Sequence, residues 1–192
     1  YVTHVAAIKK MLSDPAPFIA QLLEKAEAVG IDGYDVDYEP QQMDGVEASE
    51  EVDLREAFMG FLGSLGEKLK SKGLTLTIDV GGCPEFNDFT CTGAKHISGL
   101  AQANCMHTFG SRSLSDFKML AQNDQGGLGR KWAPGFEPGN MKSNPQAFGD
   151  ILNYLKAQGV ASIATWEVHE LNLGIPQPQW LFDHVNAFLD NE

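Results

Sequence analysis

Three acidic side chains alternate along a short segment in the first quarter of the chain. Asp35, Asp37 and Glu39 are separated by single residues within the run 31–40 (IDGYDVDYEP). Successive side chains of a β-strand point to opposite faces, so we expect these three carboxylates to share one face. Carboxylates this close repel one another, which drives their pKa values apart and leaves a proton donor beside an anion near neutral pH. This arrangement suits general acid/base catalysis.

The same carboxylates are also suitable oxygen ligands for Mg²⁺ or Ca²⁺. A metal site would need ligands from neighbouring strands, for which Asp79 and Glu167 are candidates, although Glu167 is expected on the opposite face from Trp166. We favour acid/base chemistry with no metal and no cofactor. A third interpretation, an acidic edge strand facing solvent, is disfavoured because the flanking helical segments predict cover on both faces of the strand.

The run 32–39 (DGYDVDYE) resembles the D-G-x-D-x-D-x-E signature of glycoside hydrolase family 18, the chitinases and chitinase-like proteins. Members of that family are (β/α)8 barrels with this signature on the fourth strand, and they cleave β-1,4-linked N-acetylglucosamine polymers. The resemblance implies retaining, substrate-assisted hydrolysis, an exception to the usual scheme with two carboxylates. In it Glu39 is the general acid/base, Asp37 orients the acetamido group that acts as nucleophile, and Asp35 holds and tunes Asp37. Asp32 and Gly33 complete the motif as its structural part.

Two other segments follow the family pattern, one of them with a departure. Segment 161–167 (ASIATWE) resembles the last strand of the barrel, whose Trp, here Trp166, forms the floor under the cleaved sugar; the alternative is a core aromatic. Segment 104–109 (NCMHTF) stands where the family carries M-x-Y-D, so Thr108 replaces the Tyr and Phe109 replaces the Asp. Losing such a donor typically costs about 10²–10³ in rate.

An aromatic pair near the end of a weaker strand offers further contacts with a sugar. Trp132 and Phe136, in the run 131–139 (KWAPGFEPG), are interpreted as sugar-stacking residues or as lid or core residues. The candidate substrate-binding residues are Trp166, Tyr38, Met106, Thr108 and Trp132.

The elements that must position these residues alternate between helix and strand, which indicates an α/β protein with a parallel sheet. Hydrophobic periodicity predicts helices at about 14–30, 54–73, 144–159 and 179–189, and strands at about 2–8, 33–39, 74–80, 103–109, 131–136 and 161–168. An open doubly wound sheet and a (β/α) barrel of the TIM type both fit. Neither Gly81-Gly82 nor the glycines of 126–129 have G-x-G-x-x-G spacing, which disfavours the nucleotide-binding sheet.

The chain is a single domain of 192 residues, whereas a barrel normally takes about 250. We therefore expect a barrel that lacks about its first two βα units, covering strands three to eight of the family fold. An unseen segment, a partner chain or a local rearrangement would cover the open edges. The alternative to an enzyme is a catalytically inactive chitinase-like subunit that serves carbohydrate binding or assembly.

Net charge and cysteine content limit the classes of binding partner and the cellular location that we expect. The chain has 26 acidic and 14 basic side chains, a formal charge of −12, which disfavours nucleic acid as a partner. No apolar run approaches the ~20 residues of a membrane span. Cys83 and Cys91 flank a short loop and are a candidate disulfide, with three reduced cysteines as the alternative; Cys105 is expected to be a buried free thiol. The chain opens at Tyr1 rather than Met, which indicates an N-terminus made by processing or by choice of the expressed chain, and we expect a secreted or luminal protein.

Overall fold

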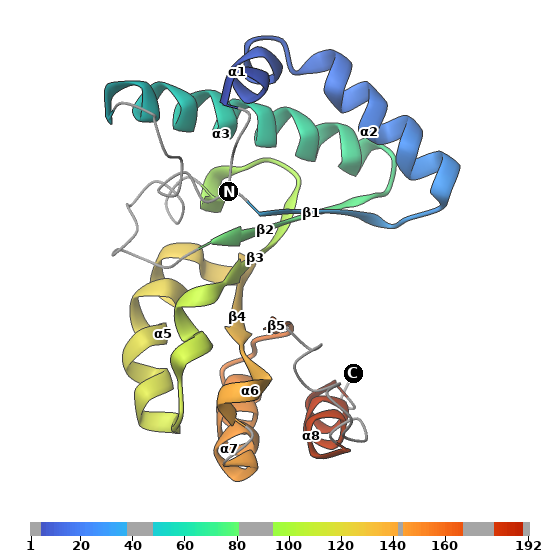
Figure 1. The fold of residues 1–192 in the computed structure, drawn as a ribbon. Helices are drawn as coiled ribbons and strands as arrows, with labels where there is room; N and C mark the ends of the chain where they lie inside the picture. The colour runs from blue at the N-terminus through green and yellow to red at the C-terminus, as the bar shows by residue number, and fades with distance from the viewer. Residues whose placement is uncertain (1–4, 38–47, 81–93, 142–143, 167–178, 190–192) are drawn as a thin grey trace.

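The computed structural model describes residues 5–37, 48–80, 94–141, 144–166 and 179–189. Its centre is a sheet of five parallel strands whose spatial order follows the chain. The strands are β1 (Gly33–Asp37), β2 (Thr75–Val80), β3 (Leu100–Cys105), β4 (Trp132–Phe136) and β5 (Ala164–Thr165). Figure 1 shows this sheet curling from β1 round to β5, so the fold is a partial (β/α) barrel.

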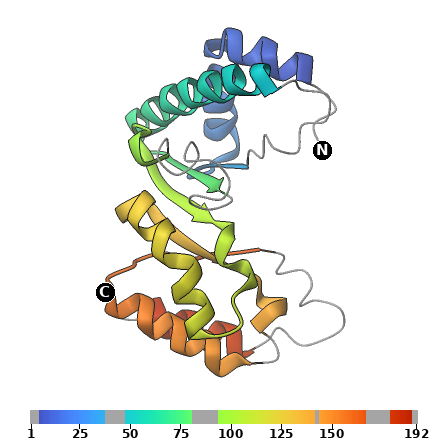
Figure 2. The same ribbon diagram turned by 90° about the vertical axis from the view of Figure 1, so that its left-hand side faces the viewer.

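The helices lie on the convex side of the curled sheet, as the two perpendicular views in Figures 1 and 2 show. The N-terminal group is α1 (Val5–Ser13), α2 (Ala16–Val29) and α3 (Ala48–Ser71), which packs against β2. The C-terminal group is α5 (Leu114–Leu128), α6 (Pro138–Met141), α7 (Pro145–Ala157) and α8 (Gln179–Leu189). Two 3₁₀ helices, η2 (Met106–Gly110) and η3 (Gly129–Lys131), flank α5. None of the described helices is both long and apolar enough to cross a membrane.

Local sequence signals account for several helix ends. The side chain of Asn144 accepts a hydrogen bond from the N–H of Ala147 at 3.2 Å, and Pro145 occupies the first turn of α7. Gly30 ends α2 in the left-handed conformation, with φ of 74°. The helices predicted at 14–30, 144–159 and 179–189 are confirmed with small shifts of their ends.

The core fills the space between the helices and the convex face of the sheet. In its N-terminal part, Leu65 and Leu69 of α3 pack beside Leu76 of β2, and all three are fully buried. In the C-terminal part, the ring of Phe136 on β4 stacks on Phe117 of α5 at 5.7 Å between centroids. These contacts hold α3 and α5 against the convex face of the sheet.

Two predicted strands are wrong within the described residues. The segment from Val5 onward is α1, because Ile8, Met11 and Leu12 recur at helical spacing and pack on the core. The strand predicted at 103–109 ends at Cys105 and continues as η2, in which the Thr108 hydroxyl bonds back to the Cys105 carbonyl. The last strand is also shorter than predicted, since β5 comprises two residues.

Candidate active site

Asp35 and Asp37 lie on the concave face of β1 and are exposed. The opposite face is fixed by Tyr34, whose hydroxyl donates a hydrogen bond of 2.6 Å to the Leu22 carbonyl of α2. This confirms the predicted alternation, in which Tyr34 faces the helices and the carboxylates face away. The expectation that both faces are covered is wrong for the described residues, because β1 is an outer strand of the curled sheet and its concave face is open.

A polar network joins the first three strands on this face. The hydroxyl of Thr77 donates to Asp35, its register partner on β2. The amide nitrogen of Asn104 donates to Asp35 Oδ1 at 3.2 Å and to Asp79 Oδ1 at 2.8 Å. Gln102 in turn donates to Asn104 Oδ1 at 2.6 Å. Neutral donors therefore bridge two carboxylates, which lowers the repulsion between them.

The surroundings of Asp37 shift its pKa. The residue as a whole is exposed, but partial burial of its carboxyl group raises the pKa above the ordinary value of 3.8, and the negative charge of Asp35 raises it further. Its register partner on β2 is Asp79, so acidic side chains occur on both strands at this level. Repulsion of this kind favours retention of a proton by one member of the group.

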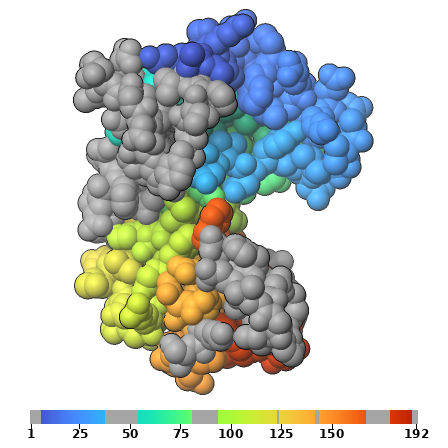
Figure 3. Space-filling model, viewed as in Figure 1, coloured from blue at the N-terminus to red at the C-terminus, as the bar shows by residue number. Residues whose placement is uncertain are grey.

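Trp166 follows β5, with its backbone N–H bonded to the Phe136 carbonyl at 2.9 Å. Ile163 and Thr165 line a groove against α8, so alternation places Ala164 and Trp166 towards the concave face. The indole is 46 % exposed, which is incompatible with the alternative of a core aromatic. Figure 3 shows the concave side as a hollow between the blue N-terminal helices and the orange to red C-terminal part.

Thr108 is fully buried, and its hydroxyl donates to the Gly135 carbonyl at 2.7 Å. A hydroxyl committed to the backbone in this way has no donor left for a substrate. Met106 begins the same 3₁₀ helix and is half-buried. Phe109, noted from sequence only as a departure from the family pattern, has its ring where a side chain at Gly135 would lie. Gly135 alternates with core-facing Phe136, so this ring covers the concave side of β4, and the bare glycine in a strand was the available signal.

Trp132 is 3 % exposed and packs tilted against Phe117, with ring centroids 6.2 Å apart. Phe136 is fully buried as well. Both aromatic residues are therefore core residues, the second of the two interpretations from sequence. Neither presents an exposed ring face on which a sugar can stack.

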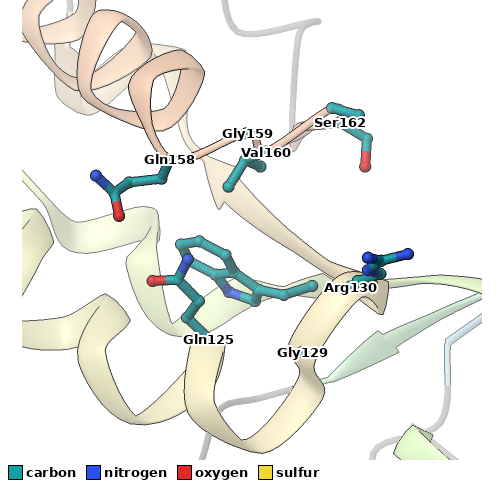
Figure 4. A pocket seen from close by; sticks show the side chains of 9 residues that line it. Gln125, Gly129, Arg130, Gln158, Gly159, Val160 and Ser162 are labelled. Carbon is teal, nitrogen blue, oxygen red and sulfur yellow. The ribbon is translucent and has the colours of Figure 1, made fainter.

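The edge of Trp132 borders a cavity of about 600 Å³ at the N-terminal ends of β4 and β5 (Figure 4). In Figure 4 the side chains of Gln125 and Gln158 lie on one side of it, and those of Arg130 and Ser162 on the other. Asp37 stands at the C-terminal end of β1, where active sites of (β/α) barrels are built. The cavity is therefore at the opposite end of the sheet from the carboxylates.

A buried carboxylate behind β3 was also missed. Asp124 on α5 is fully buried and accepts a hydrogen bond from the Cys105 thiol at 3.1 Å, while Nδ1 of His107 lies 3.2 Å from the same oxygen. Cys105 is free and buried, as predicted. The signal for Asp124 was its position in the buried stripe of α5, which otherwise consists of Phe117, Ala121 and Leu128.

Several predicted site residues lie outside the described residues: Glu39, Tyr38, Cys83, Cys91 and Glu167. Within the part of the chain that the structure describes, no group of three or more His, Cys, Asp or Glu side chains is arranged to hold a metal ion. The described candidate residues are thus the carboxylate pair on β1, the amide and hydroxyl groups that support it, and separately the exposed Trp166 that follows β5.

Comparison with solved structures identifies the class of fold. The chain superimposes on the catalytic domain of a family GH18 chitinase from the fern Peteris ryukyuensis with a TM-score of 0.67 and 16 % identity, covering 95 % of this chain and 65 % of that domain. A chitinase from Chromobacterium violaceum gives 0.65 and 13 %, covering 94 % of this chain and 73 % of that one. Catalytic domain 2 of the Ostrinia furnacalis Group II chitinase gives 0.68 and 10 %, covering 96 % and 74 %.

The chain thus has the fold of chitinase catalytic domains as a partial barrel, spanning about two thirds of the length of the fern domain. No family model and no curated protein sequence matches it. At these identities the likeness concerns the fold. The chemistry of this chain has to be argued from its own residues.

Proposed function

We propose that the chain acts on β-1,4-linked N-acetylglucosamine glycans by retaining, substrate-assisted hydrolysis. The observation that carries the proposal is the pair Asp35 and Asp37, exposed side by side on the concave face of β1 in a chitinase-like fold. The raised pKa of Asp37 supports it, because a carboxyl group that retains its proton more readily can donate a hydrogen bond to the substrate.

In the proposed reaction, Glu39 donates a proton to the glycosidic oxygen as the bond from that oxygen to the anomeric carbon breaks. The carbonyl oxygen of the substrate's own acetamido group attacks the anomeric carbon and forms an oxazolinium ion, with Asp37 orienting the amide. Water then adds to the anomeric carbon and returns the proton to Glu39, which restores the acetamido group. Asp35 holds and tunes Asp37 throughout, and the exposed indole of Trp166 forms the floor under the sugar.

The direct test is hydrolysis of a fluorogenic chitin oligomer by the wild-type chain beside Glu39→Gln. The variant should lose about 10²–10⁴ in kcat, because it removes a general acid/base. Glu67→Gln is the matched control, since Glu67 is an exposed carboxylate on α3 and should keep full turnover. Equal turnover of wild type and Glu39→Gln would overturn the assignment of the general acid/base.

The second candidate is a chitinase-like subunit that binds glycan or a partner chain without hydrolysis. It is favoured by the buried Thr108 hydroxyl and by the outer edges of β1 and β5, which have no strand partner among the described residues. A folded chain that binds chitin oligomers, measured by calorimetry, but does not hydrolyse them would favour this candidate. Sedimentation velocity of the chain would then show whether it associates with a second chain through an outer strand.

A secreted or luminal location belongs to the same proposal. It is supported by the likeness to chitinases and by the candidate disulfide between Cys83 and Cys91. Mass spectrometry after alkylation with and without reduction tests the disulfide. Alkylation of Cys83 and Cys91 without prior reduction in denatured protein would contradict it.

A further inference from the structure

Asn104 occupies a singular place among the described polar residues of the concave face. Its one amide nitrogen donates to two carboxylates that come from different strands, Asp35 Oδ1 at 3.2 Å and Asp79 Oδ1 at 2.8 Å. Its amide oxygen is held by Gln102 at 2.6 Å, which fixes the orientation of the amide plane. The nitrogen therefore faces the carboxylates because the oxygen is already taken.

The hydrogen bond from Asn104 to Asp35 joins two strands that are not neighbours in the sheet. β3 does not pair with β1, because β2 lies between them. Asp35 therefore leans across β2 to meet Asn104, and Thr77 on β2 donates to the same oxygen, Oδ1. The two donors hold this carboxylate towards β2 and β3.

We propose that Asn104 is a positioning residue for the carboxylate pair of β1: its amide holds Asp35 towards β3 and bridges it to Asp79. The catalytic meaning of this role rests on the proposed function, in which Asp35 tunes Asp37. The geometry itself does not depend on it. The charged groups that face Asp35 among the described residues are Asp37 on its own strand and Asp79 on β2, whereas β3 contributes the neutral amides of Gln102 and Asn104.

The test that needs no activity is the titration of Asp37, followed by NMR of carbon-13 labelled aspartate carboxyl groups in wild type and Asn104→Leu. Leucine matches asparagine roughly in volume but donates no hydrogen bond. We expect the pKa of Asp37 to rise further in the variant, because the negative charge of Asp35 loses a donor that screens it. Asp37→Asn identifies the resonance.

Asn153→Leu is the matched control, since it makes the same exchange at an exposed amide on α7, outside the network. Its Asp37 titration should stay close to wild type. An unchanged or lowered Asp37 pKa in Asn104→Leu, or an equal rise in Asn153→Leu, would overturn the inference. If Asn104→Leu does not fold, Asn104→Asp keeps the shape and exchanges the donor for an acceptor, and the same upward shift is expected of it.

A second arm separates this inference from the proposed function. If wild type hydrolyses a chitin oligomer, the acidic limb of its pH profile for kcat/KM should move to higher pH in Asn104→Leu with the titration of Asp37, with KM little changed. A merely structural role would lower activity at every pH without moving the limb, and that result would overturn the inference. Absence of turnover in wild type would count against the proposed function alone, because the NMR titration still decides the role of Asn104.

Discussion

At the scale of single residues, Asp37 makes stability depend on pH. Its pKa in the folded chain lies above the ordinary 3.8, so the folded state binds this proton more tightly than the unfolded state. The contribution of this group to stability is therefore present below pH 3.8 and is lost as the pH rises through the folded pKa. Burial and the charge of Asp35 are the causes, in that order.

The free energy of unfolding of Asp37→Asn should consequently exceed that of wild type increasingly as the pH rises. In acid the two free energies should become equal. Thermal unfolding of both proteins between about pH 3 and about pH 7 measures this difference. A difference that is constant across this range would mean that Asp37 does not titrate abnormally.

The thiol of Cys105 should be unreactive in the folded chain. Burial, the charge of Asp124 and the hydrogen bond to that carboxylate all raise its thiol pKa, and the thiolate is the reactive form. In a Cys83→Ser, Cys91→Ser background, a thiol reagent at about pH 8 should label Cys105 only after denaturant is added. Labelling of the native protein at the rate of the unfolded chain would contradict the burial of this sulfur.

Side-chain alternation made part of the site predictable from sequence. Asp35 and Asp37 lie on the face opposite Tyr34, as the period of two predicts. The partners of Asp35 were not predictable, because Thr77 and Asn104 come from strands distant in the chain and depend on register. Thr108 was placed by a family pattern that assumed a straight strand, whereas the chain turns into η2 at Met106.

At the scale of elements, α3 approaches the turn before β3 through a glycine contact. A Cβ added at Gly66 would clash with the carbonyl oxygen of Ser98. Gly99, which lies opposite Gly66, has φ of 75°. Backbone atoms cannot move aside as the end of a flexible side chain can. The helix therefore lies this close to the turn because both residues lack a side chain.

Gly66→Ala should destabilise the chain by about 1–3 kcal/mol through overpacking. Gly63→Ala on the same helix, where a Cβ meets nothing within 4 Å, should instead stabilise it by about 0.5–1 kcal/mol. Urea unfolding of the two variants compares them directly. Equal effects of both alanines would show that α3 lies further from the turn.

Helices with caps and long apolar stripes were the elements that the sequence predicted best. Asn144 with Pro145 marks the start of α7, and Gly30 marks the end of α2. Short apolar runs were harder, because the first described helix, α1, reads equally well as a strand until its contacts with α3 are known. The two-residue β5 shows the same limit, since pairing with β4 decides its length.

At the scale of the whole molecule, the described sheet has two outer strands, β1 and β5, and an apolar groove beside the second. The groove between β5 and α8 has a volume of about 340 Å³ and is lined mainly by apolar side chains. Phe182 and Leu189 on α8 are 40 % and 56 % exposed there. Exposed apolar surface next to an outer strand of a sheet favours association.

An apolar dye such as anilinonaphthalene sulfonate should therefore bind the folded chain, and Phe182→Lys with Leu189→Lys should weaken its fluorescence. Met119→Lys is the matched control, because Met119 is 69 % exposed on α5, outside the groove. Fluorescence titration gives the comparison. An equal loss with the control would place the dye elsewhere.

The strand order has a consequence for how the chain is made. From β2 through β5, each described strand pairs with the described strand that precedes it, so this sheet needs no insertion between strands already paired. Each new βα step can dock as it leaves the ribosome, on an edge that is already in place. Synthesis and assembly of this sheet can therefore run in the same direction, one strand at a time.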